Sequence, residues 1–177
     1  MGQYYFPIIL SENGRIVAWM LAHEYANGLK LMEHSFVGNN FVCTFEFELT
    51  SLGKYHKSRV VWAGDYADQE EVGENLYHLC GEHEKIAPHM KGLLEEYRYV
   101  VNHSKKQFVD KTKVPSRDGY AIHPLPLLTC EGNGRGGGDY REPMSPLVGT
   151  WARDVISVET GAPSDFEEIV FDLIEKN

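Results

Sequence analysis

The sequence predicts an α+β fold, with one compact domain over residues 1–177, a mixed or antiparallel sheet and a few short helices. Three observations support this prediction. Aromatic and β-branched runs recur along the chain, as strands require. Between them, apolar residues at helical spacing mark two amphipathic segments. The 177 residues have the length of one domain and contain no segment with the composition of a linker.

The first elements form a hairpin. Gln3 to Leu10 is aromatic and β-branched, which predicts an opening strand, and Pro7 within it favours a sheet edge or a bulge. Asn13-Gly14 is typical of a tight hairpin turn. Arg15 to Met20 is then the returning strand, and Leu29 to His34 is a further short strand.

Two helices are expected in the middle of the chain. From Asn39 to Leu52, apolar residues fall at helical spacing behind an asparagine that can cap the N-terminus. Alternating Phe41, Cys43 and Phe45 also allow a strand there, and we prefer the helix. Asp68 to Cys80 begins with acidic residues, which suit the positive end of a helix dipole, and Gly81 is placed to end it.

The other expected elements are short. Arg59 to Ala63 predicts a buried strand that carries Asp65 at its end, and Leu93 to His103 with Gln107 to Val109 predicts a hairpin. The remaining expectations are strands at Leu125–Thr129 and Val155–Glu159, a loop at Val114–Tyr120, an irregular stretch at Gly132–Pro146 and a last segment at Phe166–Ile174.

Composition and charge restrict the class of protein. Hydrophobic residues make up 42% and charged residues 24%, which excludes wholesale disorder. The net charge of −9 argues against direct binding of nucleic acid, because phosphate contacts need a basic face and only Lys105–Lys113 is a modest basic run. The acidic C-terminal segment from Glu159 can steer the chain towards a basic protein or imitate phosphates.

Compartment follows from three further features. No apolar run approaches the length of a membrane helix, and no signal peptide is visible. Cys43, Cys80 and Cys130 are odd in number and widely spaced, which is typical of reduced thiols. We therefore expect a cytoplasmic protein without a membrane association.

A short string repeats within the chain. Trp62-Ala63-Gly64-Asp65 recurs as Trp151-Ala152-Arg153-Asp154, which an old internal duplication or coincidence would explain. In a duplication, Asp65 would converge with Asp154 or Asp139 on a common cleft, where carboxylates can hold Mg²⁺ or act as acid and base. Trp62 and Trp151 could then stack on a base or sugar, although core packing is the simpler interpretation.

The most unusual segment is rich in glycine. Such a backbone can approach a ligand closely and form an anion-binding nest. The spacing G-x-G-x-x-G is present, but no helix is expected to follow it and no Gly-Lys-Ser/Thr occurs, so neither nucleotide-binding motif is supported. The candidate ligand-binding residues are Asn133, Gly134, Arg135, Gly136, Gly137, Gly138, Asp139 and Tyr140, with Trp62, Asp65, Trp151 and Asp154.

Catalytic and metal signatures are weak. His78, Cys80, His83 and His89 do not match a standard zinc spacing, so surface histidines are the simpler interpretation and no metal site is expected from them. Cys130, with His123 upstream, is the best placed thiol, yet a small buried residue is favoured. No cofactor is predicted apart from the Mg²⁺ considered above, and catalysis stays open.

Several strings look familiar. Four segments of the chain resemble a family of small proteins from tailed phages and bacteria. They are Met1-Gly2-Gln3-Tyr4-Tyr5, Gly28 to Ser35, Trp62 to Asp68 and His123 to Tyr140. The resemblance implies a cytosolic setting and a phage gene expressed during infection, and it carries no catalytic residues with it.

Two functions are therefore considered. The leading hypothesis is a cytosolic binding protein, phage-encoded, that engages a host or defence protein. The alternative is a ligand-binding protein or enzyme that acts on a nucleotide-like or phosphorylated small molecule through the Gly132–Tyr140 loop.

Overall fold

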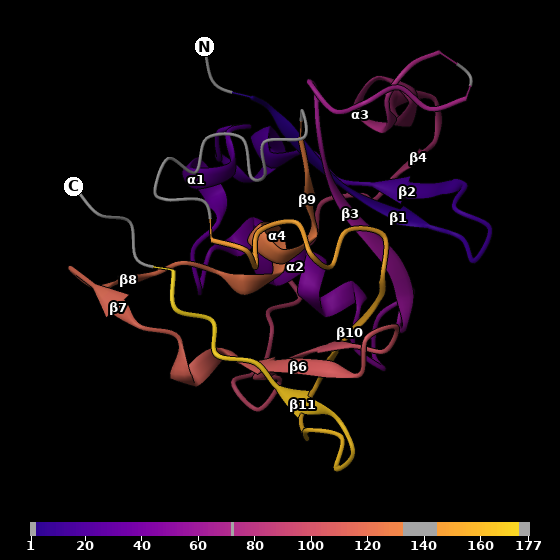
Figure 1. The fold of residues 1–177 in the computed structure, drawn as a ribbon. Helices are drawn as coiled ribbons and strands as arrows, with labels where there is room; N and C mark the ends of the chain where they lie inside the picture. Colours follow the sequence, from indigo (N-terminus) through magenta and orange to yellow (C-terminus); the bar gives the residue numbers. More distant parts are fainter. Residues whose placement is uncertain (1–2, 72, 133–144, 174–177) are drawn as a thin grey trace.

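A computed structural model describes residues 3–71, 73–132 and 145–173 (Figure 1), and the statements below concern those residues. The elements in chain order are β1 (Tyr5–Leu10), β2 (Ile16–Trp19), η1 (Ala22–Tyr25), α1 (Leu31–His34), α2 (Asn40–Glu48), β3 (Ser58–Gly64), α3 (Leu76–Leu79), η2 (Cys80–Glu82), β4 (Glu84–Lys85), β5 (Tyr99–Asn102), β6 (Gln107–Asp110), η3 (Lys111–Lys113), β7 (Ser116–Arg117), β8 (Tyr120–Ala121), α4 (Pro124–Thr129), β9 (Cys130–Glu131), β10 (Val155–Glu159) and β11 (Glu167–Glu168).

Nine strands of the described residues form one mixed sheet. Eight of them follow the order β11-β6-β5-β10-β3-β1-β2-β4, and β9 also pairs with β3. The longer strands pair antiparallel, whereas the two-residue strands β4, β9 and β11 are added in parallel. This arrangement confirms the predicted α+β fold with a mixed sheet and short helices.

The sheet separates a large core from a small one. Side chains alternate across β3, so that Val60 and Trp62 enter the large core, while Val61 and Ala63 enter the small one. Helices α2 and α4 cover the large-core face near the middle of the molecule, whereas α3 lies on the other side of β3 (Figure 1). The face under α2 and α4 therefore supplies most of the buried apolar surface.

The first hairpin is confirmed, with one correction. Gly14 takes a positive φ of 78° in the turn between β1 and β2, as the Asn-Gly pair predicts. Pro7 does not mark a sheet edge, because β1 pairs with both β2 and β3. It is tolerated because its missing N–H falls opposite Met20, just after β2 ends, while its carbonyl still accepts the Met20 N–H at 3.2 Å.

The two predicted helices have different outcomes. Helix α2 is confirmed, and the Asn39 side chain caps it by accepting the N–H groups of Phe41 and Val42. The helix predicted over 68–80 is largely wrong, since α3 begins only at Leu76. Asn75 caps α3 and its amide also donates to backbone carbonyls of the preceding loop, so the polar cap competes with helix formation upstream.

Two predicted strands are helices. Leu29–His34 contains α1, in which the Glu33 carboxylate turns back to accept the Lys30 N–H at 3.0 Å. Leu125–Thr129 lies in α4, where Pro124 occupies the first turn and the His123 ring accepts the Leu125 N–H at 3.0 Å. An apolar run this short does not distinguish a buried strand from a buried helix.

The other short predictions are mostly confirmed. β5 and β6 form the expected hairpin, and β10 matches Val155–Glu159. The expected loop at Val114–Tyr120 instead contains most of the small hairpin β7–β8, whose turn residues Asp118 and Gly119 both have positive φ. Most of the irregular stretch Gly132–Pro146 lies outside the described residues.

Candidate functional site

A cleft of about 340 Å³ lies beside α2. Its size is at the lower end of the range for ligand pockets in proteins. One side is α2 with the turn that precedes it, and the other side is the segment before β5 together with η3. The lining residues are Val37, Gly38, Cys43, Glu46, Leu93, Leu94, Glu95, Tyr97, Arg98, Lys111 and Thr112.

A buried polar network forms the base of this cleft. Glu46 projects from α2, and one of its carboxylate oxygens accepts from the Lys111 ammonium group of η3. The other oxygen lies 2.7 Å from Nε2 of His123, the cap residue of α4. Since Nδ1 of His123 accepts the Leu125 N–H, Nε2 carries the proton and donates to Glu46. The network therefore ties together three elements that are distant in sequence.

Glu46 and His123 each have one protonation state at neutral pH. Burial alone would raise the pKa of Glu46, but the nearby Lys111 ammonium and the His123 ring lower it to about 2. Burial lowers the pKa of His123, against the opposing pull of Glu46. At neutral pH the carboxylate is therefore ionised and the imidazole is neutral.

Two further groups at the cleft are held in one protonation state. Burial raises the pKa of the Cys43 thiol to about 11, so the thiol stays protonated at neutral pH. Arg98 binds the buried carboxylate of Asp110 through two of its nitrogens, with Nε 3.1 Å from Oδ1. Despite burial, Arg98 and Thr112 lower the pKa of Asp110.

Exposed apolar side chains lie at and near the cleft. Val37 is 40% exposed and Leu94 is 56% exposed, and both line the cleft. Tyr120 of β8 is 67% exposed and packs edge-on against Phe36, next to Val37. Exposed apolar groups gathered around a hollow are typical of a binding surface. The cleft thus combines exposed apolar side chains with the buried ion pair of Glu46 and Lys111.

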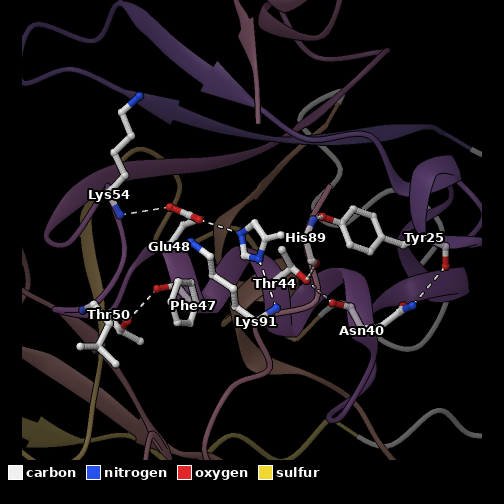
Figure 2. Close-up of polar contacts among 10 residues, drawn as sticks. Tyr25, Asn40, Thr44, Phe47, Glu48, Thr50, Lys54, His89 and Lys91 are labelled. Carbon is white, nitrogen blue, oxygen red and sulfur yellow. Dashed lines mark hydrogen bonds and ion pairs between the residues drawn. The ribbon is translucent and has the colours of Figure 1, made fainter. Parts of the chain in front are cut away.

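A second polar network lies two residues further along α2 (Figure 2). Glu48 is nearly buried and accepts from His89 Nε2 at 2.8 Å and from the Lys54 N–H at 3.0 Å. A pocket of about 360 Å³ opens beside it, with Phe47 and Lys91 in its lining. His89, considered above only as a metal ligand, is therefore a contact between α2 and the segment before β5.

The structure places both candidate tryptophans in the core. Trp62 and Trp151 are 0% exposed, which leaves no face on which a ligand could stack. Trp62 Nε1 donates to His34 Nε2 at 2.9 Å, and Trp151 Nε1 donates to Gln107 Oε1 at 3.0 Å. Both indoles have the buried hydrogen-bond partner that such rings need, as in core packing.

The candidate aspartates are not brought together. Asp65 follows the last residue of β3 and accepts the Tyr4 N–H at 3.0 Å. Asp154 precedes Val155, which pairs with Arg59 at the other end of β3, and it binds Asn102 and Lys105. A strand of this length puts roughly 20 Å between the two positions. The repeated strings also differ in structure, since Trp62 lies in a strand and Trp151 in a turn.

The described residues include only some of the other expected sites. Asn133 to Tyr140 lie outside the described residues, so the glycine-rich loop stays a prediction. Cys130 is buried, its thiol donates to the Leu127 carbonyl, and burial raises its pKa to about 12. Over residues 3–71, 73–132 and 145–173, no group of three or more His, Cys, Asp or Glu side chains is arranged to hold a metal ion.

One sequence pattern indicates the two buried networks, although the site residues predicted above do not include them. Glu46 is four residues from Val42 and three from Leu49, so it lies on the apolar stripe of α2. Glu48 is three residues from the buried Phe45 and seven from the buried Phe41, so it borders the same stripe. Carboxylates on the apolar stripe of a helix must find buried partners. Those partners, however, come from loops and caps that no spacing rule connects to α2.

Comparisons with known proteins found no matching family model, no similar curated protein and no similar solved structure. Among the described residues, none of the helices has both the length and the apolar character needed to cross a bilayer.

Proposed function

We propose that this chain is a binding protein without catalytic chemistry, and that the cleft beside α2 receives an apolar side chain of a protein partner. The observation that carries the proposal is the cleft itself, with exposed Val37 and Leu94 at its mouth. A pocket that accepts one anchoring side chain is the usual centre of a protein interface.

The protonation states at the cleft support recognition over acid–base catalysis. General acid–base groups work best when their pKa lies near the operating pH. Glu46, with a pKa of about 2, and Cys43, with a pKa of about 11, are far from neutrality. Their task is better explained as shaping and polarising a cleft than as moving protons.

Charge suggests the kind of partner. The net charge of −9 favours a basic protein, because complementary potentials speed encounter and suppress wrong partners. In the phage setting that the sequence resemblance implies, the partner is a host or defence protein in the cytoplasm.

The proposal is tested by Leu94→Asp, with Val170→Asp as the matched control. Val170 is 81% exposed and lies outside the cleft, so both substitutions add one charge at an exposed apolar position. Partners are captured from lysate, identified, purified and titrated by calorimetry. A charge in the anchor pocket should weaken binding by about tenfold or more, with little change in the control. Equal affinities, or no stoichiometric partner, would contradict the proposal.

One structural observation supports the alternative function, a ligand site at the Gly132–Tyr140 loop. The described start of the glycine-rich segment is firmly held, since β9 pairs with β3 and Glu131 binds Arg153, which also contacts Glu70. A thermal-shift screen against nucleotides and sugar phosphates, with Arg135→Ala as the test variant, examines this alternative. A ligand at 100 times its Kd would add about 2.7 kcal/mol to the stability. A hit that Arg135→Ala abolishes would favour the loop over the cleft.

A further inference from the structure

The segment between β4 and β5 forms one side of the cleft without a helix or strand of its own. Residues 86–98 connect the two strands, and most of their side chains are exposed. Connections of this length without secondary structure are uncommon in compact domains and are often functional. The second half of the segment supplies Leu93, Leu94, Glu95 and Tyr97 to the cleft. The shape of the cleft therefore depends on how this segment is held.

His89 provides most of the polar attachment in the first half of the segment. Its backbone N–H donates to Tyr25 Oη at 3.3 Å, and its carbonyl accepts from Thr44 Oγ1 at 3.4 Å. Its Nε2 binds Glu48 at 2.8 Å, while its Nδ1 accepts the Lys91 N–H at 3.4 Å. Figure 2 shows these contacts gathered on one side of α2.

The receiving side of this attachment is rigid. Glu48 lies on α2, is 7% exposed, and its second oxygen is fixed by the Lys54 N–H. The ring of Phe47 packs edge-on against His89 at 5.6 Å between centroids. By contrast, the residues that follow His89 are exposed until the partly buried Leu93, and Gly92 takes a positive φ of 45° between them. The contact at His89 is thus followed by three exposed residues before Leu93 packs against the large core.

We propose that residues 86–98 act as a strap over α2, that the contact between His89 and Glu48 is its latch, and that release of the latch opens the cleft to a partner. Two carboxylates of α2 then have different roles. Glu46 shapes the base of the cleft, and Glu48 holds the strap that forms its movable wall. The functional consequence rests on the proposed binding role of the cleft, whereas the movement of the strap can be measured without any partner.

Cys43 is a native reporter of that movement. It lines the cleft and is partly exposed, whereas Cys80 and Cys130 are buried. Alkylation with N-ethylmaleimide, located by mass spectrometry, therefore reads strap opening at Cys43 and global unfolding at the other two thiols. Burial raises the pKa of all three thiols, so the reaction is run at one fixed, mildly alkaline pH.

The test compares wild type with His89→Ala and with His78→Ala, a control at an exposed histidine on α3. Loss of the latch should speed the alkylation of Cys43 by about fivefold to tenfold, while the other two cysteines and the control variant keep the wild-type rate. An unchanged Cys43 rate would overturn the proposal, and so would a parallel rise at all three thiols.

Glu48→Gln is the milder second variant if His89→Ala does not fold. The amide keeps the shape and a hydrogen bond but removes the charge, so Cys43 should react faster than in wild type. A wild-type rate in this variant would also overturn the strap. A latch effect in a protein that binds no partner at the cleft would leave the strap standing and remove only the proposed function.

Discussion

Single buried charges carry much of the specificity of this fold. Glu46 is 1% exposed and binds both Lys111 and His123, each from a different element. Breaking such a network from one side leaves charged or polar partners without an acceptor in the core, which costs far more than losing an exposed pair. The hydrogen bonds of this one residue therefore help to fix how α2, η3 and α4 pack against one another.

Glu46→Ala should lower the free energy of unfolding by about 3–5 kcal/mol, because Lys111 and the His123 N–H lose their buried acceptor. Glu168→Ala is the control, since Glu168 pairs with Lys113 at the surface and such pairs contribute about 0–1 kcal/mol. Urea denaturation of both variants makes the comparison. Similar losses in the two would show that the buried network is not strongly stabilising.

His34 should make stability depend on mildly acidic pH. Burial lowers its pKa to about 4, although the Gly28 carbonyl opposes this, while the unfolded chain binds a proton near 6.5. The unfolded state thus holds more protons between these values, and stability falls as the pH drops through that window, by about 3 kcal/mol in total.

The matching variant is His34→Gln, whose amide can still accept from Trp62 and donate to the Gly28 carbonyl but does not titrate. Urea midpoints measured from pH 7 to pH 4 should fall less steeply than in wild type. The remaining slope includes His123, whose pKa is lowered by burial in the same direction. Identical slopes in both proteins would contradict the role of His34.

At the scale of elements, the caps set the helices. Helix α2 begins where Asn39 accepts two backbone N–H groups, and α3 and α4 begin at Asn75 and His123 in the same manner. In each case a polar side chain satisfies donors that the first turn leaves free. The helix predicted over Asp68–Cys80 is shortened because its cap, Asn75, lies well inside that range and the helix begins only at Leu76.

Asn39→Ala should destabilise the protein by about 1 kcal/mol, the usual cost of a lost N-cap. Asn39→Asp is the control, because its carboxylate can still accept from Phe41 and Val42 and suits the positive end of the helix. Thermal unfolding followed by circular dichroism measures both. An alanine variant as stable as wild type would mean that the packing of α2 alone fixes its start.

At the scale of the whole molecule, the chain carries a net charge of −9, while Glu46 and Lys111 pair with each other at the cleft. Asp165 and Glu167 lie near the sheet edge at β11, in the acidic C-terminal segment. Their field acts over roughly a Debye length of 10 Å, so it affects encounter with a partner more than the final contacts.

Asp165→Lys combined with Glu167→Lys should slow association with a basic partner and reduce the dependence of that rate on salt. The dissociation rate should change little, because rim charges act mainly on encounter. Stopped-flow or surface-based kinetics at low and high salt, with the partner identified through the Leu94→Asp experiment, give both rates. An unchanged association rate would show that the acidic segment does not contribute to recognition of the partner.

Local patterns were enough for much of the architecture. Strand β3, the Asn-Gly hairpin, the β5–β6 hairpin and the capped helix α2 were predictable, because hydrophobic period, turn chemistry and capping act within a few residues. The same reasoning failed at Leu125–Thr129, where a run of apolar residues has no period and the proline-rich start and the His123 cap decided for a helix.

By itself, the sequence determined the α+β class and the net negative charge of the chain. Only the tertiary structure decided the site. It buried Trp62 and Trp151, placed Asp65 and Asp154 at opposite ends of β3, and assembled a cleft from Glu46, Lys111 and the 86–98 segment. The physical reason is distance along the chain, since Glu46 meets partners 65 and 77 residues away. Contacts of that range are selected by the packing of the whole core, which no local pattern encodes.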